Sequence, residues 1–294
     1  LDNIAEQIIA QERNYRKQYI TKRKMTGSGK SFFAKREMAN AFFATNDHIL
    51  ILDPENEYTA LTEQLHGQTI YLAPDSHSYL NPMDLDLSTD VGESPMLMQA
   101  DFLLSQCELM MASYGNPLMP IEKSLIDRCI SLVYRDYLKN PRPENMPVLG
   151  DLYQCLREQH NSRADDLATA MEIYVTGSLS YLNHRTNVDL NNRMVCYNTS
   201  KLGQGLKKLV MSNVQKHIWQ RTAVNRYAGI TTRIFLDEFH LLLKEPQTAA
   251  YTAEIYKRFR KWNGIPTSLT QNVKDLLDSS EIENILENSD FVLM

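Results

Sequence analysis

A short glycine-containing stretch, Gly27 to Phe32, has the composition of a loop that binds the phosphates of a nucleotide. Gly27, Ser28 and Gly29 allow backbone N–H groups to turn inward around phosphate oxygens, and the positive end of a following helix adds attraction. The Lys30 side chain would reach the β- and γ-phosphates, and the Ser31 hydroxyl would bind Mg²⁺. Phe32 completes the predicted nucleotide-binding segment. Taken alone, the same letters also fit an ordinary turn ahead of a helix.

A second motif lies far downstream and favours the nucleotide interpretation. The apolar run that ends at Leu236 is followed directly by Asp237 and Glu238. In a P-loop enzyme this aspartate would position Mg²⁺ and its water shell, and the glutamate would polarise the attacking water. An acid pair after a strand also occurs at helix starts and in surface turns. Its place downstream of the glycine loop, across intervening strands and helices, argues against coincidence.

Three further groups of side chains have two interpretations each. Gln271 ends the strand after the acid pair, where its amide would either sense the γ-phosphate or cap the strand. Arg258 and Arg260 lie at a basic helix end, either as solvated charges or as a finger that reaches a neighbouring subunit's nucleotide. The acids of "LDPENEY" would either assist water and metal or cap the following helix; these are Asp53, Glu55 and Glu57.

The elements that must position these residues alternate between strands and helices. Continuous apolar runs predict buried parallel strands, at 48–52, 68–74, 193–200, 232–240 and 265–272. Helical patterns occupy 1–19, 31–43, 57–65, 202–225 and 249–262. This alternation predicts an α/β fold with a mostly parallel sheet flanked by helices and a site at the carboxyl ends of its strands.

The middle of the chain has a different character. Helical periodicity runs through 96–111, 121–138, 149–159 and 164–174. We therefore expect an all-α insertion over 94–185. It would divide one α/β domain into a first part, 1–93, with the glycine loop and the first strands, and a second part, 186–294, with the acid pair and the sensor strand.

Composition excludes several classes of function. The 294-residue chain has a formal net charge of -5, so nucleic-acid binding would need a local basic patch. Its four cysteines and seven histidines are scattered, without the spacing of a disulfide framework or a zinc site. No apolar run approaches the roughly 20 residues that cross a bilayer, and no signal peptide opens the chain. These features suit reduced thiols in a cytosolic protein.

Six segments, in order along nearly the whole chain, resemble the conjugation ATPases of type IV secretion systems, the TraC-like relatives of the fourth VirB component. They are "GSGKSFFAKREM", "ILDPENEYTAL", "YLNPMDL", "NHRTNVDLNNRMVCYNTSKL", "IFLDEFHLLL" and "RKWNGIPTSLTQNV". The resemblance implies a RecA-like P-loop domain of the HerA/FtsK superfamily with an inserted all-α subdomain. It also implies Mg²⁺-dependent ATP hydrolysis that powers channel or pilus assembly and substrate transfer.

The resemblance further implies site residues and partners. Arg258 or Arg260 falls where the family has an arginine that acts in trans, and the positions of the family's nucleotide site are matched by Lys30, Ser31, Asp237, Glu238 and Gln271. The implied assembly is a homo-oligomer, a hexamer in the family, attached peripherally to the cytoplasmic side of the inner membrane. Implied partners are the coupling ATPase and inner-membrane channel proteins, with DNA or a relaxase–DNA complex as the substrate.

The chain departs from the family's pattern just before the glycine loop. The family has a strand and a first glycine where this chain has "TKRK", residues 21–24. A sheet without its central P-loop strand would not be stable, so we expect further residues in the natural protein between Lys24 and Met25. By the same comparison, we expect further segments before Leu1 and beyond Met294.

Two alternatives of different kinds remain open. A DNA translocase of the same superfamily would need a basic loop facing a pore, and the net charge of -5 gives it little support. A nucleotide-binding assembly scaffold with negligible turnover is the other alternative. Glu238 argues against it, because a scaffold has no use for an acid that activates water.

Overall fold

The computed structural model describes residues 29–87, 94–112, 118–243, 246–259, 261–270 and 285. Its five described strands form one sheet in which every pairing is parallel, with the order β2-β3-β1-β4-β5. The strands are β1 (His48–Asp53), β2 (Gln68–Tyr71), β3 (Met194–Asn198), β4 (Thr232–Leu236) and β5 (Gly264–Ser268). The prediction of a mostly parallel sheet flanked by helices is confirmed.

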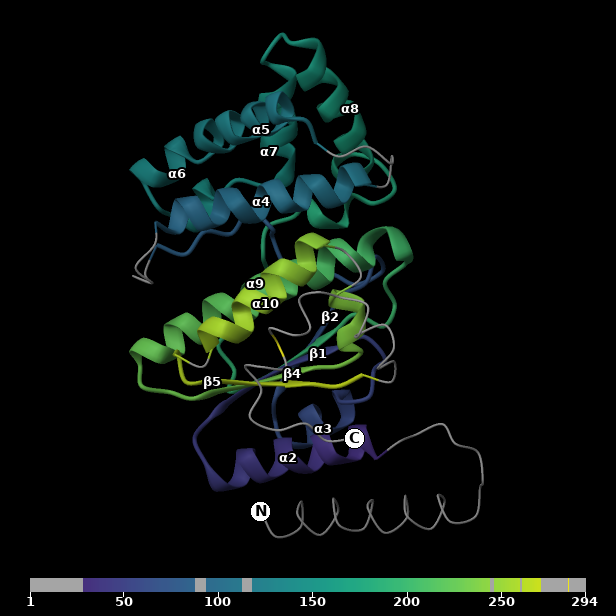
Figure 1. Cartoon of the computed structure of the whole chain (residues 1–294), viewed down its shortest axis with the longest axis vertical. Coiled ribbons are helices and arrows are strands. Elements are labelled where there is room, and N and C mark those ends of the chain that lie inside the picture. Colours follow the sequence, from purple (N-terminus) through teal and green to yellow (C-terminus); the bar gives the residue numbers. More distant parts are fainter. Residues whose placement is uncertain are drawn as a thin grey trace.

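The central strand β1 is buried on both faces, as its continuous apolar run predicts. Ile49 and Ile51 face a core built with α2 (Lys30–Ala44) and α3 (Thr59–Gln64). Leu50 and Leu52 face the opposite core, which includes side chains of α9 (Gln204–Tyr227) and α10 (Pro246–Phe259). The sheet therefore lies between two helical layers, with α2 and α3 below it and α9 and α10 above it in Figure 1.

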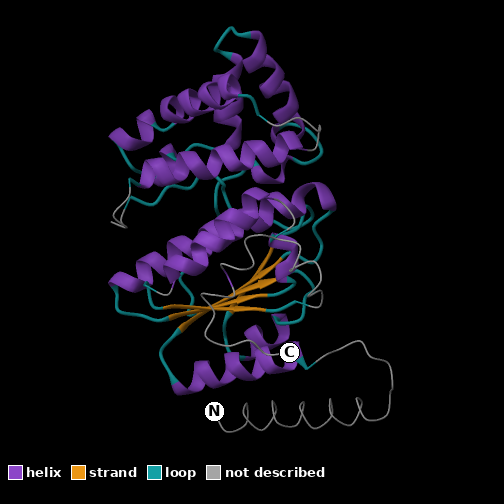
Figure 2. Cartoon of the chain, viewed as in Figure 1, coloured by secondary structure: helices purple, strands orange, loops and turns teal. Residues whose placement is uncertain are grey.

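Five helices form a further layer beyond α9 (Figures 1 and 2). They are α4 (Pro95–Ala112), α5 (Pro120–Val133), α6 (Arg135–Lys139), α7 (Leu149–Arg157) and α8 (Ser162–Val175). Their apolar side chains join those of α9 and the upper face of the sheet in one continuous core. The helical character of the predicted insertion is thus confirmed, whereas the division at residues 94 and 185 stays a prediction.

Helix α9 holds the segment through which the chain enters this helical layer. The Asn213 amide donates to the Leu80 carbonyl at 2.9 Å. The Lys216 Nζ donates to the carbonyls of Pro82 and Asp84, at 2.9 and 2.6 Å, and lies 4.8 Å from the centre of the Phe102 ring of α4. Lys216 is only 4% exposed, so a buried cation ties together the entry segment, α9 and the helical layer.

Several predicted elements differ in extent from those observed. The strand predicted over 68–74 ends at Tyr71, and the strand predicted over 232–240 ends at Leu236, where the acid pair forms a turn ahead of a 3₁₀ helix, η3 (Phe239–Leu242). The helix predicted over 121–138 divides at Tyr134 into α5 and α6. The helix predicted at 1–19 and the expected insertion between Lys24 and Met25 lie outside the described residues.

Among the helices in the described ranges, none is both long and apolar enough to cross a bilayer.

The buried ammonium of Lys216 predicts a specific pH dependence of stability. Burial lowers the pKa of Lys216 from 10.5 to about 7, partly offset by Asp84. Between these pH values the unfolded chain binds a proton that the folded chain releases, so stability should rise with pH. We expect the free energy of unfolding of the wild type to rise relative to Lys216→Met from pH 7 to pH 9, by at most about 1.4 kcal/mol per pH unit. Urea unfolding at several pH values measures it. A constant difference would mean that Lys216 stays charged.

Candidate nucleotide site

Helix α2 begins at Lys30, directly after Gly29. Gly29 has no side chain with which to cap the helix, and the first turn of α2 contains no acidic residue. A Cβ built on Gly29 would meet no atom within 4 Å, so the space beside the helix start is open in the described part of the chain. The positive end of α2, with Lys30 and Ser31 in its first turn, is therefore available to an anion.

Asp53, at the carboxyl end of β1, is fully buried and shapes the turn that follows. Its Oδ1 accepts the backbone N–H of Glu57, and its Oδ2 accepts that of Tyr58, both at 2.9 Å. The Cys196 thiol lies 3.7 Å from the same Oδ2. Burial raises the pKa of Asp53, while the two backbone N–H groups lower it. Asp53 therefore holds the turn that leads into α3 and is not the N-cap of that helix, and the geometry favours this structural role over that of a metal ligand.

Asp237 lies beside Asp53, because β1 and β4 pair with Leu52 opposite Leu236. Its backbone N–H donates to the Leu52 carbonyl at 3.1 Å, and the residue is 5% exposed. Burial is the largest cause that raises the pKa of Asp237, and with the charges of Glu57, Glu238 and Asp53, against the Glu238 backbone N–H, the pKa reaches about 7. A carboxylate buried among other carboxylates is unfavourable unless a cation balances it.

Glu238 adopts a left-handed backbone conformation, with φ 44° and ψ 46°. Residues other than glycine rarely adopt it, and such residues cluster at functional sites. The turn brings His240 back beside it, so that His240 Nδ1 lies 3.1 Å from Glu238 Oε2. The Thr270 Oγ1, just beyond β5, lies 3.5 Å from the same nitrogen. Glu238 is 7% exposed, so this residue is largely buried beside His240.

Tyr58 lies near both the start of α2 and the residues that follow β4. It stands at the start of α3 and is fully buried. Burial is the largest cause that raises the pKa of its phenol, and the charges of Asp237 and Glu57 raise it as well. The Ser31 hydroxyl is close enough to lower that pKa, although the two oxygens do not reach hydrogen-bond geometry. The start of α2 and the end of β4 thus both approach the same phenol.

The other predicted site residues are placed as follows. Arg258, near the end of α10, donates to Glu254 at 2.7 Å and lies 5.4 Å from the centre of the Trp219 ring. Its contacts with these two residues are within its own chain. Phe32 lies in the first turn of α2. Gly27, Ser28, Arg260 and Gln271 fall outside the described residues.

Sequence analysis missed two residues that the fold brings into the site, Tyr58 and His240. Both follow a predicted acid closely, in "ENEY" and "DEFH". Proximity in sequence was therefore an available signal. Their burial and direction depend on a turn held by Asp53 and on the left-handed conformation of Glu238.

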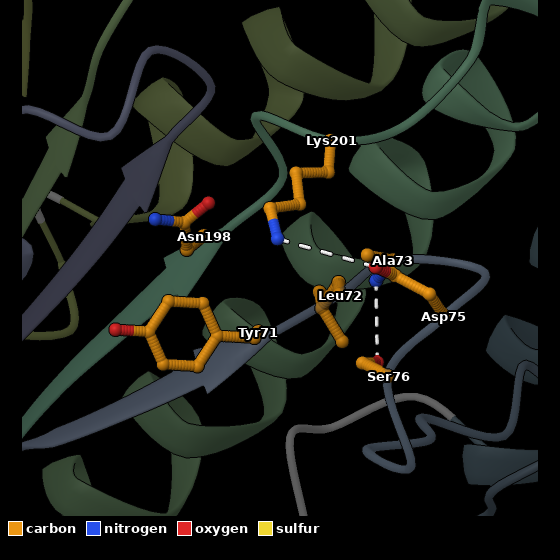
Figure 3. A pocket seen from close by; sticks show the side chains of 7 residues that line it. All are labelled: Tyr71, Leu72, Ala73, Asp75, Ser76, Asn198 and Lys201. Carbon is orange, nitrogen blue, oxygen red and sulfur yellow. Dashed lines mark hydrogen bonds and ion pairs between the residues drawn. The ribbon is translucent and has the colours of Figure 1, made fainter.

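A separate cavity of about 140 Å³ lies at the carboxyl ends of β2 and β3 (Figure 3). Its lining includes Tyr71, Asn198 and an exposed ion pair in which Lys201 Nζ lies 4.0 Å from Asp75. β2 and β3 lie on the opposite side of β1 from β4, so this cavity is distinct from the site around Asp237.

The parallel sheet, the helix that starts at the glycine loop and the acids at the end of β4 define a P-loop nucleotide-binding domain. The TraG P-loop domain family matches residues 7–294, and the chain belongs to that family. This confirms the predicted resemblance to the P-loop ATPases of conjugation at the level of the family. A comparison with curated proteins finds no match.

Solved structures share the fold of this chain. VirB4 of Thermoanaerobacter pseudethanolicus matches with a TM-score of 0.78 and 23% identity, over 89% of this chain and 73% of that one. The bacterial conjugative coupling protein TrwBΔN70, in complex with sulphate, matches with a TM-score of 0.56 and 14% identity, over 90% and 65%. TrwB with the ATP analogue ADPNP matches with a TM-score of 0.55 and 15% identity, over 90% and 67%. These likenesses confirm the predicted P-loop fold.

The role of Asp53 in holding the turn before α3 predicts a loss of stability when it is replaced. Replacing it in Asp53→Ala leaves two backbone N–H groups without their acceptor, so the free energy of unfolding should fall by about 1–3 kcal/mol. Urea unfolding without nucleotide measures this. The control is Asp75→Ala, whose exposed ion pair should change stability by less than about 0.5 kcal/mol. Unchanged stability with lost Mg²⁺ binding would instead make Asp53 a metal ligand.

Proposed function

We propose that this domain binds ATP with Mg²⁺ at the start of α2 and hydrolyses it. The observation that carries the proposal is the burial of Asp237 among carboxylates on the sheet edge that α2 approaches. Such a cluster of negative charge favours a cation, and the open end of α2 beside Lys30 favours the phosphates that accompany it. Membership of the TraG P-loop family and the ADPNP complex of TrwB support the same ligand.

The residues at the site suit Mg²⁺ rather than a softer metal. Across the described ranges, no group of three or more His, Cys, Asp or Glu side chains is arranged to hold a metal by itself. Mg²⁺ commonly needs only one or two protein oxygens, with water and phosphate supplying the rest. Ser31 and Asp237 would supply those oxygens, and the ion would offset the negative charge of the phosphates. Glu57 Oε2, which is buried without a hydrogen-bond partner, is free to bond its water shell.

Each remaining residue has a role in this proposal. Lys30 neutralises charge on the β- and γ-phosphates. Glu238 takes a proton from the attacking water, and His240, 3.1 Å from its carboxylate, orients it. Gln271 would sense the γ-phosphate beyond Thr270. These roles would make one hydrolytic site from residues at the start of α2, residues just after β4 and the residue that follows Thr270 in the sequence.

In the cell, we propose that hydrolysis drives a motor of conjugative type IV secretion, in channel or pilus assembly and substrate transfer. The motor would act as a homo-oligomer on the cytoplasmic side of the inner membrane, with the coupling ATPase and channel proteins as partners. The family match and the VirB4 fold support this role.

A DNA translocase would instead show turnover that DNA stimulates. A scaffold would bind nucleotide without turnover.

Lys30→Ala should weaken ATP binding and abolish hydrolysis, because the variant loses the cation that faces the β- and γ-phosphates. Calorimetric titration with ADPNP and a phosphate-release assay measure the two effects. The exposed Lys201, beside the separate cavity, supplies a matched control in Lys201→Ala. Turnover that survives Lys30→Ala but is lost in Lys201→Ala would place the nucleotide elsewhere.

Glu238→Gln should retain ATP binding and stall hydrolysis, because the amide keeps the shape of the side chain and loses the base. We expect turnover to fall on the order of 10²-fold or more. ADPNP affinity and single-turnover hydrolysis separate the two steps. A collapse of binding would make Glu238 structural, and wild-type protein that binds ATP without turnover would favour the scaffold.

An arginine of the α10 end should act across a subunit boundary. A finger supplied in trans contributes about 10³–10⁵ in rate in other P-loop enzymes. We expect Arg258→Ala or Arg260→Ala to bind ATP normally and hydrolyse it poorly, and mixing with Lys30→Ala to restore activity at shared interfaces. Absence of rescue by either variant, in mixtures shown to co-assemble, would leave both arginines as structural or surface charges, as the contacts of Arg258 with Glu254 and Trp219 also allow.

A further inference from the structure

The hydroxyl of Tyr58 is a buried polar group without a hydrogen-bond partner among the described residues. The rest of the residue is firmly held. Its backbone N–H donates to Asp53 Oδ2 at 2.9 Å, and its carbonyl accepts both the backbone N–H and the hydroxyl of Thr62 at 3.0 Å. The ring packs in the core beneath the sheet, with Lys35 Nζ 5.8 Å from its centre. The hydroxyl therefore cannot turn to another partner without moving the start of α3.

Three other buried tyrosines of this chain have partners for their hydroxyls. Tyr134 donates to the Met83 carbonyl and accepts from the Gln99 amide at 2.9 Å. Tyr137 donates to Leu85 at 3.1 Å, and Tyr181 to Ser78 at 2.5 Å. A buried polar group without a partner is uncommon and requires an explanation, often a missing water or ion. Tyr58 differs from these tyrosines in facing the proposed nucleotide site.

The surroundings of this hydroxyl show what kind of partner it would take. Ser31 in the first turn of α2 and Asp237 just after β4 are both near enough to affect the phenol, and these are the two proposed Mg²⁺ ligands. Glu57 Oε2, the oxygen of the preceding residue, is also buried without a partner. A phenol hydroxyl can donate one hydrogen bond and also accept one. Two buried oxygens without hydrogen-bond partners thus belong to neighbouring residues, and both of these residues interact electrostatically with Asp237.

We propose that Tyr58 is a positioning residue for the Mg²⁺ of the nucleotide site, with its hydroxyl bonded to the ion's water shell when the nucleotide is present. The phenol oxygen would accept from a metal-bound water and donate its own proton to a carboxylate. This inference rests on the proposed Mg²⁺–ATP site. In this role Tyr58 differs from a structural tyrosine, because its hydroxyl stabilises the protein with Mg²⁺ and nucleotide bound and does not stabilise the protein without them.

The test compares Tyr58→Phe with Tyr134→Phe, each of which removes only a buried hydroxyl. We expect Tyr58→Phe to raise the Mg²⁺ concentration for half-maximal ADPNP binding about three- to tenfold, the effect of one lost hydrogen bond. ADPNP affinity in EDTA and the melting temperature of the empty protein should not fall. Tyr134→Phe should do the reverse, lowering the melting temperature and leaving the Mg²⁺ dependence unchanged. Calorimetry over a MgCl₂ series and thermal unfolding provide these values.

The outcomes separate this inference from the function on which it rests. Wild-type protein without Mg²⁺-dependent ADPNP binding would overturn both. Wild-type Mg²⁺ dependence that Tyr58→Phe leaves unchanged would overturn the role of Tyr58 alone. A melting temperature of the empty protein that falls in Tyr58→Phe as much as in Tyr134→Phe would also overturn it, because the hydroxyl would then have a structural partner.

Discussion

The arrangement of the site depends on carboxylates buried together at one edge of a parallel sheet. The register of β1 and β4 places Asp53 and Asp237 side by side, and Glu57 and Glu238 add two more acids nearby. Such a cluster is unfavourable in a protein interior unless each charge has a partner. Asp53 has two backbone N–H groups as partners. Asp237 has the Glu238 backbone N–H and otherwise acids around it, so it is the carboxylate that most needs a cation.

Other elements of the fold bring positive charge and hydrogen-bond partners to these buried acids. Helix α2 directs its positive end, with Lys30 and Ser31, toward the edge where the acids gather. The turn after β4 holds Glu238 beside His240, and the chain beyond β5 reaches the same histidine through Thr270. On the other face of the sheet, α9 carries the buried Lys216 and links the sheet to the helical layer. A continuous core through α9 gives the layer a rigid base beside the nucleotide domain.

The parts predicted well from sequence were those set by local patterns. The apolar run at His48–Asp53 specified a strand buried on both faces, and the spacing at Lys30–Ala44 specified a helix. The acid pair after β4 was recognisable because strand and carboxylates are contiguous. Strand order was not predictable in this way, because β2 pairs with β3, which follows it by more than a hundred residues. The helix break at Tyr134 was also missed; the Tyr134 hydroxyl is bound there to Met83 in the entry segment, a contact between residues far apart in sequence.

Within the site, too, local motifs were predictable from the sequence and contacts that depend on the fold were not. Lys30, Ser31, Asp237 and Glu238 follow from motifs, whereas the burial of Tyr58 and the approach of His240 depend on turns. Asp53 illustrates the limit most clearly, since its sequence context allowed either a cap or a metal ligand. The two hydrogen bonds from Glu57 and Tyr58 show instead that it holds the turn before α3.

The most direct test of this account is an experimental structure of the protein with Mg²⁺ and ADPNP. The account predicts phosphates at the start of α2 beside Lys30, and the metal between the Ser31 hydroxyl and the Asp237 carboxylate. A nucleotide bound instead in the cavity lined by Tyr71 and Lys201, or a metal held by Asp53 after release of its backbone hydrogen bonds, would contradict it.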